Sequence, residues 1–197
     1  MNELQKRILA EGRVLPGDII KVDGFMNHLV DIGLMRSIAR DIKNHFAGKT
    51  ITKVMTVEAS GIPVATITVD ELGVPMLFAK KAKSDNIEGG LIRSEIYSYT
   101  YRKKVSLIVS AEWLSPDDKV LIVDDFMANG EAMRGLVDII DQVGAELVGI
   151  GVAIEKGFQG GGDRLRAHGI DVYSLAIIEK AMPGCIVFRS ENRTPCT

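Results

Sequence analysis

The stretch VLIVDDFMANGEAM, residues 120–133, decides the expected fold. Its four leading apolar residues predict a buried strand that ends on two adjacent carboxylates, Asp124 and Asp125. A small, polar turn containing glycine follows, and residues 131–143 have the apolar spacing of a helix. A strand that passes through such a turn into a helix is typical of α/β proteins, whose functional crevice lies at the carboxyl ends of parallel strands.

The rest of the chain alternates in the same way. Residues 31–46 predict a helix, because Ile32, Met35, Ile38 and Ile42 recur at helical spacing. Further helices are expected over residues 3–11, 64–72 and 162–168, and further strands over 19–22, 51–57, 76–79, 147–154 and 172–178, with a hairpin or flap over 94–109. This order predicts a mostly parallel twisted sheet flanked by helices, within a single domain spanning residues 1–197.

Composition narrows the class of protein. Of 197 residues, 46% are hydrophobic and 25% are charged, which is the balance of a globular protein with a substantial core. The net charge of −2 argues against a broad surface for nucleic acid or an anionic membrane. No apolar run approaches the roughly 18 residues that cross a bilayer, and two cysteines are too few for a disulfide framework. We therefore expect reduced thiols and a cytoplasmic location.

Two carboxylates at the end of a buried strand repel each other and lose hydration, so they need a partner. The candidates are a metal ion and the two adjacent hydroxyls of a ribose. The residues that follow, Ala128, Asn129, Gly130, Glu131 and Ala132, are small enough for backbone amides to surround a phosphate at a helix N-terminus. Together these features favour a ribose 5-phosphate pocket, whereas a solvated loop start is the plain alternative.

This motif resembles the phosphoribosyl pyrophosphate (PRPP) motif of the type I phosphoribosyltransferases. Its Ala-Asn-Gly sequence is similar to the form found in the xanthine-using members of that family. The segments KVDGFMNHLVD, VEASGIPVAT, IYSYTYRKKVSLIVS and EKGFQGGGDRL also resemble these members in the expected order, so the resemblance covers essentially the whole chain. It implies the type I fold, with a mobile flap and a small hood formed by about residues 1–35 and 155–197.

The resemblance also assigns the loops that would hold PRPP. Ala59, Ser60 and Gly61 follow a predicted strand and correspond to the pyrophosphate loop, and Lys81 lies where the family has a lysine on the pyrophosphate side. Taken alone, these residues are an ordinary turn and a solvated lysine cluster. Residues 87–109 fit a flap whose closure excludes water from the site, although a static hairpin would have the same pattern.

Four residues are candidates for binding the base. Lys156 follows an apolar strand, and its ammonium is able to donate to an exocyclic oxygen of an oxo-purine, while Phe158 is placed to stack on the ring. In the hood segment Asn27 offers a donor and an acceptor, and Ile20 offers apolar contact. The plain alternative is a solvated lysine and a core phenylalanine. The three histidines, at positions 28, 45 and 168, lack metal-ligand spacing and are interpreted as structural.

The resemblance implies transfer of a phosphoribosyl group from PRPP to xanthine, with Mg²⁺ held mainly by PRPP and water rather than by protein ligands. It also implies a homodimer. Asp124 and Asp125 are the expected catalytic residues. Hypoxanthine, guanine or another base remains an alternative substrate. A PRPP-sensing purine repressor is a further alternative, but it needs a basic DNA-binding appendage that this weakly acidic chain does not suggest.

Overall fold

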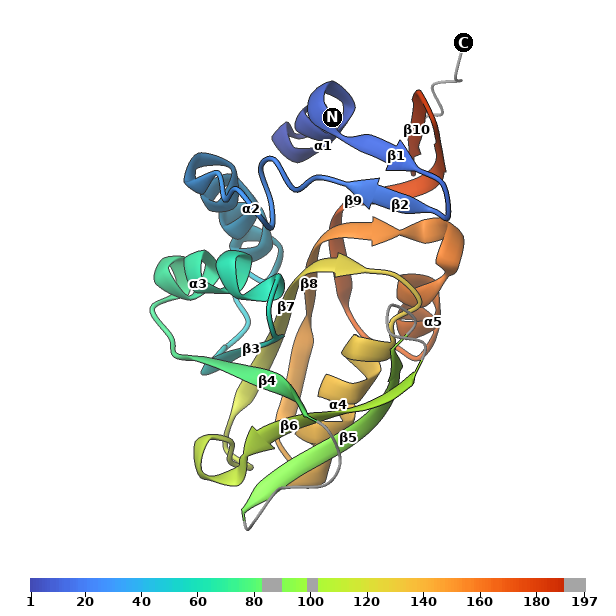
Figure 1. Cartoon of the computed structure of the whole chain (residues 1–197). Helices are drawn as coiled ribbons and strands as arrows, with labels where there is room; N and C mark the ends of the chain where they lie inside the picture. Colours follow the sequence, from blue (N-terminus) through green and yellow to red (C-terminus); the bar gives the residue numbers. More distant parts are fainter. Residues whose placement is uncertain (83–89, 99–102, 190–197) are drawn as a thin grey trace.

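The computed structural model describes residues 1–82, 90–98 and 103–189 (Figure 1). The helices are α1 (Glu3–Glu11), α2 (Ile32–His45), α3 (Gly61–Leu72), α4 (Glu131–Val143) and α5 (Gly161–Ala167), with short 3₁₀ turns η1 (Ala111–Trp113) and η2 (Gly157–Gln159). The strands are β1 (Arg13–Leu15), β2 (Ile19–Lys21), β3 (Lys53–Val57), β4 (Met76–Ala82), β5 (Leu91–Ser98), β6 (Lys103–Ser110), β7 (Lys119–Met127), β8 (Glu146–Lys156), β9 (Val172–Met182) and β10 (Cys185–Phe188).

Eight strands form one sheet in the order β10-β9-β8-β7-β3-β4-β6-β5. Its central strands, from β9 to β4, are parallel, whereas β6, β5 and β10 pair antiparallel at the two edges. The expected mostly parallel sheet is therefore confirmed. Because β7 lies in the middle of the sheet, its carboxyl end opens onto the crevice expected for an α/β fold.

The two faces of the sheet carry separate hydrophobic clusters. The side chains of α1, α2 and α3 pack on one face, and those of α4 pack on the other together with the β5–β6 hairpin (Figure 1). Burial on both faces explains why β7 begins as a continuous apolar run rather than an alternating one. Asp31 caps α2 by accepting a hydrogen bond from the Leu34 amide at 3.1 Å, which accounts for the predicted start of that helix.

Several boundaries differ from the expectation. Helix α3 begins at Gly61 rather than at residue 64, because Pro63 is tolerated in the first turn, where its missing N–H has no helical acceptor. Strands β7 and β8 continue past the predicted ends, to Met127 and Lys156. The short strands β1 and β10 were not predicted. Strand β10 pairs with β9 across a turn in which Gly184 has φ 79°. The Pro-Gly pair in this turn is a signal for a hairpin that the prediction did not use.

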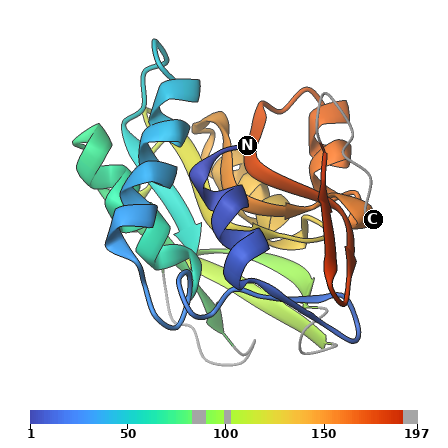
Figure 2. The same cartoon turned by 90° about the horizontal axis from the view of Figure 1, so that it is seen from above.

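The N-terminal helix lies against the C-terminal strands of the sheet (Figure 1). Asn2 caps α1, and its Nδ2 donates to the backbone oxygen of Leu175 in β9 at 2.7 Å. Both views accordingly place α1 beside the strands at the β10 edge (Figure 2). Cys185 is disulfide-bonded, so the expectation of a reduced thiol is wrong for this residue, and Cys196 lies outside the described residues.

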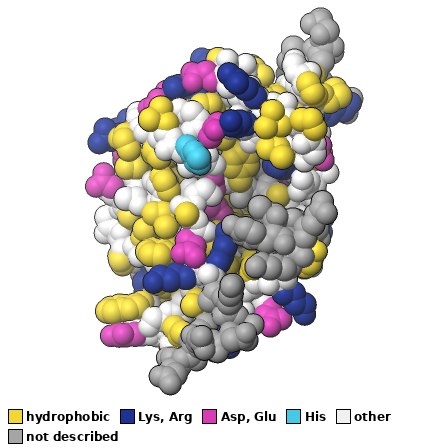
Figure 3. Space-filling view, viewed as in Figure 1, with side chains coloured by type: hydrophobic (Ala, Val, Ile, Leu, Met, Phe, Trp, Pro, Cys, Tyr) yellow, Lys and Arg dark blue, Asp and Glu magenta, His cyan; other side chains and the backbone are white. Residues whose placement is uncertain are grey.

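The surface agrees with the modest net charge. On the face seen in Figure 3, acidic and basic side chains are interspersed among the described residues rather than gathered into a patch of one sign. None of the helices in the described ranges has the length and apolar character needed to span a membrane.

Candidate active site

Asp124 and Asp125 lie near the carboxyl end of β7, and each is only 3% exposed. Asp125 is held from two directions. Its Oδ1 accepts a hydrogen bond from the Ser60 hydroxyl at 2.9 Å, and its Oδ2 accepts one from Asn27 Nδ2 at 3.3 Å. The structure therefore brings together residues from three distant segments of the chain at a single carboxylate.

Asp124 has different neighbours from Asp125. Its Oδ1 accepts a hydrogen bond from the Asp125 amide at 2.9 Å. A Cβ built on Gly61 would lie well inside 3.0 Å of both Asp124 Oδ1 and Thr56 Oγ1, so only glycine permits α3 to begin so close to this carboxylate. Thr56 is fully buried, and its hydroxyl has no hydrogen-bond partner among the described residues.

Burial controls the protonation of Asp124. Loss of hydration raises the pKa of the Asp124 carboxyl well above its usual 3.8, and the nearby charge of Asp125 raises it further. The ammonium of Lys81 opposes this shift, so Lys81 lies within electrostatic reach of the pair. A buried carboxylate with this environment is poised to take up a positively charged or hydroxyl-bearing partner.

The turn between β3 and α3 is joined to β4 next to Lys81. Residues 58–60 connect β3 to α3, and the Glu58–Ala59 peptide bond is cis. Glu58 Oε1 accepts a hydrogen bond from the Lys81 amide at 2.7 Å, which joins this turn to β4. Ala59 and Ser60 are exposed, and the Ala59 carbonyl accepts a hydrogen bond from the Ile62 amide at 3.2 Å, while the Ser60 hydroxyl is the group that reaches Asp125.

The turn after β7 has the form expected of an anion-binding loop. Gly130 has φ 81° and is the N-cap of α4, a left-handed conformation that glycine adopts at low cost. The loop thus turns directly into a helix N-terminus, where amides and the helix dipole favour an anion. The Arg134 guanidinium, 2.9 Å from Glu131, lowers the pKa of the Glu131 carboxyl and holds that side chain at the start of α4.

The base-side candidates lie at the next strand end. Lys156 is the last residue of β8, and its Nζ donates to the backbone oxygen of Asp18 at 2.8 Å. Burial lowers the pKa of Lys156, with the Asp18 carboxylate opposing that shift. Phe158, in η2, is 36% exposed, so it is not a core residue. Ile20 is buried in the core cluster that contains Phe25.

Not every candidate is joined to the Asp pair. Asn27 and Ser60 donate hydrogen bonds to Asp125. Gly61 lies against Asp124, and the charge of Lys81 acts on it. No hydrogen bond or ion pair within the described ranges links Lys156 to either aspartate. The neighbouring strands β7 and β8 do bring Lys156 to the same edge of the sheet, since Met127 pairs with Glu155. The flap residues Tyr99 and Tyr101 lie outside the described residues.

Sequence reasoning missed three residues near this edge: Thr56, Glu155 and Arg166. Glu155 is fully buried and paired with Arg166. A carboxylate at the end of the apolar run VGIGVAI is an available signal for Glu155, but nothing in the local pattern identifies its partner. His45 and His168 make contacts elsewhere, with Asp171 and with the backbone of Arg164 respectively.

Comparison with known proteins agrees with this geometry. The family described as the phosphoribosyl transferase domain matches residues 29–171. A xanthine phosphoribosyltransferase of Bifidobacterium longum subsp. infantis is 50% identical over 192 residues, which cover 96% of this chain and 100% of the relative. Another, of Streptococcus pneumoniae, is 47% identical over 192 residues, covering 98% of this chain and 100% of the relative.

Solved structures show the same fold at low identity. The adenine phosphoribosyltransferase of Giardia lamblia, complexed with 9-deazaadenine, superposes with a TM-score of 0.76 at 20% identity, covering 89% of this chain and 97% of that one. The adenine phosphoribosyltransferase of Trypanosoma brucei gives a TM-score of 0.73 at 21% identity, with coverages of 88% and 78%. By its family match, its relatives and its architecture, this chain belongs to the phosphoribosyltransferase family and has the type I phosphoribosyltransferase fold.

Proposed function

We propose that the protein transfers the 5-phosphoribosyl group of PRPP to xanthine, giving xanthosine 5′-monophosphate and pyrophosphate. One observation carries the chemistry: two buried carboxylates stand at the end of the central strand, in line with a small turn that opens a helix. The choice of base is supported by relatives named xanthine phosphoribosyltransferase at 47–50% identity over nearly the whole chain.

In this proposal each part of PRPP is bound by a different group of residues. Asp124 and Asp125 take the ribose hydroxyls, which replace the Ser60 and Asn27 donors on Asp125. The amides of residues 128–132 hold the 5′-phosphate at the N-terminus of α4. The pyrophosphate lies against the turn of Ala59, Ser60 and Gly61, with Lys81 supplying positive charge.

The reaction is a displacement at C1′ of the ribose. A ring nitrogen of xanthine supplies the electron pair for the new C1′–N bond, and the C1′–O bond breaks with its pair leaving on pyrophosphate. The nitrogen releases its proton to solvent or to the departing phosphate. As the ribose ring becomes positively charged in the transition state, the adjacent carboxylates stabilise it electrostatically.

Mg²⁺ fits this arrangement as a companion of PRPP. In proteins Mg²⁺ is usually held by one or two carboxylates together with substrate phosphates and water. In this proposal PRPP and water hold most of the cation, and Asp124 and Asp125 lie beside the proposed ribose position. When bound, the cation neutralises charge on the leaving pyrophosphate.

The base is proposed to lie between β8 and the N-terminal segment. Lys156 donates to an oxo group of xanthine in place of the Asp18 carbonyl, and Asn27 reads a second edge. Phe158 and Ile20 provide apolar contact, Phe158 from an exposed turn and Ile20 from β2. Residues 1–35 and 155–197 would then form a hood over the base, and the β5–β6 hairpin would carry the flap.

A homodimer and a cytoplasmic location complete the proposal. Phe78 and Trp113 are exposed beside a cavity lined by Met76, Leu77 and Leu91, and an apolar surface of this kind favours association. Cell fractionation tests the location directly.

The deciding experiment is a transfer assay with PRPP and Mg²⁺ and separately labelled xanthine, guanine, hypoxanthine and adenine. Xanthine is expected to give the highest kcat/KM. Because a donor lysine suits an oxo-purine, a preference for adenine would remove the role proposed for Lys156. Release of pyrophosphate with none of the bases would reject the transferase proposal altogether.

A further inference from the structure

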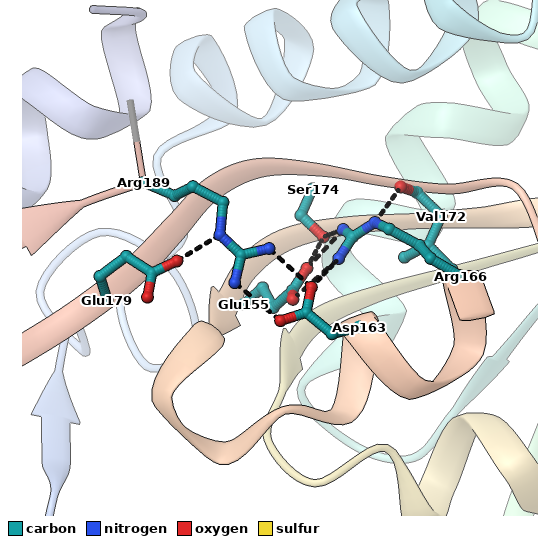
Figure 4. Close-up of polar contacts among 7 residues, drawn as sticks. All are labelled: Glu155, Asp163, Arg166, Val172, Ser174, Glu179 and Arg189. Carbon is teal, nitrogen blue, oxygen red and sulfur yellow. Dashed lines mark hydrogen bonds and ion pairs between the residues drawn. The ribbon is translucent and has the colours of Figure 1, made fainter. Parts of the chain in front are cut away.

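Glu155 carries a buried charge that the reaction described above does not use. It directly precedes Lys156 in β8 and is fully buried. Its Oε1 accepts from Arg166 Nη1 at 3.1 Å, and its Oε2 accepts from Arg166 Nη2 at 2.7 Å and from the Ser174 hydroxyl at 2.5 Å (Figure 4). A carboxylate with three donors in this geometry is held rigidly.

Helix α5 packs against the Glu155 carboxylate on one side and against the proposed phosphate-binding turn, residues 128–132, on the other. A Cβ built on Gly162 would lie well inside 3.0 Å of both Glu155 carboxylate oxygens. A Cβ on Gly161 would come equally close to the backbone of Ala128, Asn129 and Gly130. Two consecutive glycines therefore place the first turn of α5 against the backbone of the turn after β7 and against the carboxylate of Glu155, the residue before Lys156.

A second link runs along the same helix. Arg164 Nη2 donates to the backbone oxygen of Asn129 at 2.9 Å and to that of Gln159 at 3.3 Å. Arg164 thus joins the turn after β7 to the turn after β8. Any shift of α5 would move the phosphate-binding turn and the segment that follows Lys156 together.

Stability alone is a weak reason for such a pair. Buried ion pairs contribute little to net stability, because desolvation offsets much of the attraction, and apolar replacements are often tolerated. What the pair supplies is a fixed geometry, since a bidentate arginine–carboxylate contact restricts both distance and orientation.

We propose that Glu155 and Arg166 form a positioning pair that couples the phosphate subsite to the base subsite through α5. When a ribose phosphate orders the turn at residues 128–130, it fixes the position of α5. The Glu155–Arg166 contact then fixes the position of the adjacent Lys156. The inference rests on the proposed function, because it assumes that Lys156 binds the base and that the turn binds the phosphate.

The test measures coupling between the two halves of the product. Calorimetry gives the affinity of ribose 5-phosphate with and without saturating xanthine, and the ratio of the two affinities is the coupling factor. In the unmodified protein, xanthine is expected to tighten ribose 5-phosphate binding. Glu155→Gln and Arg166→Lys should each lower the coupling factor by at least about threefold. Ser174→Ala, which removes one donor to Glu155, is a milder variant in case the other two fail to fold.

Arg189→Gln provides the matched control. Arg189 makes a bidentate contact with Asp163 on the same helix, at 2.6 and 2.8 Å (Figure 4). Asp163 also accepts from Arg166 Nη1 at 3.3 Å, but no hydrogen bond or ion pair among the described residues joins Arg189 to Glu155 itself. This variant should keep the full coupling factor even if its unfolding midpoint falls. The proposal is overturned if the unmodified protein shows no coupling, if the folded Glu155 and Arg166 variants retain it, or if Arg189→Gln loses it equally.

Two further variants separate this inference from the proposed function. Lys156→Met should weaken xanthine binding, and Asp125→Asn should lower turnover. If both behave as expected while coupling is unchanged in Glu155→Gln, only the positioning role fails. If xanthine binding and turnover are unaffected by these two changes, the proposed function itself is wrong.

Discussion

At the scale of single residues, two neighbouring aspartates have different surroundings. Asp124 and Asp125 are adjacent in β7, and their carboxyls are close enough to interact, yet each has its own set of neighbours. Asp124 lies beneath Gly61, where burial raises the pKa of its carboxyl, whereas Asp125 accepts hydrogen bonds from Ser60 and Asn27. The pair thus offers one carboxyl for which burial favours the neutral form and one that is surrounded by exchangeable donors.

The first prediction concerns turnover. Asp124→Asn and Asp125→Asn should each lower kcat by about 100-fold, because each replaces a carboxyl that is proposed to hold a ribose hydroxyl in the transition state, and Asp125→Asn also removes a nearby negative charge. Steady-state kinetics with xanthine and PRPP measures this. Asp118→Asn is the matched control, since Asp118 pairs with Lys53 at 2.7 Å just before β7 begins, at the opposite end of the strand. Equal losses in all three variants would indicate a folding effect instead of a role in catalysis.

The second prediction concerns the base. Lys156→Met removes the donor but keeps most of the side-chain volume, so the KM for xanthine should rise by roughly 100-fold while the KM for PRPP changes much less. Lys21→Met, at an exposed lysine that pairs with Asp23, serves as the comparison. A rise confined to the KM for PRPP would contradict the assignment of Lys156 to the base.

The third prediction concerns pH and stability. Because the folded state raises the pKa of Asp124, the folded protein binds this proton more tightly than the unfolded chain. Its contribution to stability is present below the ordinary value of 3.8 and is lost as the pH rises through the folded-state pKa. Asp124→Asn should therefore unfold a few °C higher than the unmodified protein at pH 7. Thermal unfolding across a pH series should show this advantage vanishing below about pH 4.

At the scale of elements, close packing between helix starts and strand ends shapes the site. Helix α3 meets β7 at Gly61, and α5 meets the turn after β7 where Gly161 lies against Gly130, the N-cap of α4. Each contact depends on the absence of a side chain, so the strand ends approach one another more closely than ordinary residues allow. The proposed diol and phosphate sites therefore lie where helix starts and strand ends are in close contact.

Gly61→Ala tests this packing. Its new methyl group would meet Asp124 and Thr56, neither of which is a flexible chain end, so the start of α3 must shift. We expect a loss of about 1–3 kcal/mol in the free energy of unfolding and a higher KM for PRPP. Gly24→Ala, where a Cβ meets nothing within 4 Å, should leave both unchanged. Denaturant titration and kinetics distinguish the two, and equal behaviour would refute the close approach.

At the scale of the whole molecule, the sheet buries both faces yet leaves an apolar surface beside β4 and β6. Phe78 is 36% exposed and Trp113 is 59% exposed beside this cavity. Exposed apolar surface of this kind commonly marks an interface. The surface lies away from the β9–β10 edge, so association there would not obstruct the hood.

The dimer proposal is tested by sedimentation velocity. The unmodified protein should sediment as a dimer, and a Phe78→Glu, Trp113→Glu double variant should shift toward the monomer because charge replaces the apolar contact. Leu9→Glu, on an exposed position of α1, should remain dimeric. A monomeric unmodified protein, or a double variant that stays dimeric, would contradict this interface.

The sequence predicted the parts of the molecule that depend on near neighbours. The apolar run of β7 and the spacing of α2 and α4 follow from periodicity, and the bounds of α4 matched the prediction at both ends. The family resemblance added loop assignments that periodicity does not contain. Strands β1 and β10 escaped because short edge strands carry little periodic signal and depend on a partner strand.

Only the tertiary structure decided which distant groups meet. Asn27 and Ser60 reach Asp125 from 98 and 65 positions away, and Arg166 satisfies Glu155 from another element. Local sequence determines strand and helix because those hydrogen bonds and side-chain periods repeat within a few residues. A buried carboxylate, in contrast, takes whichever donor the packed sheet and helices bring within about 3 Å, and that outcome depends on the whole arrangement of the core.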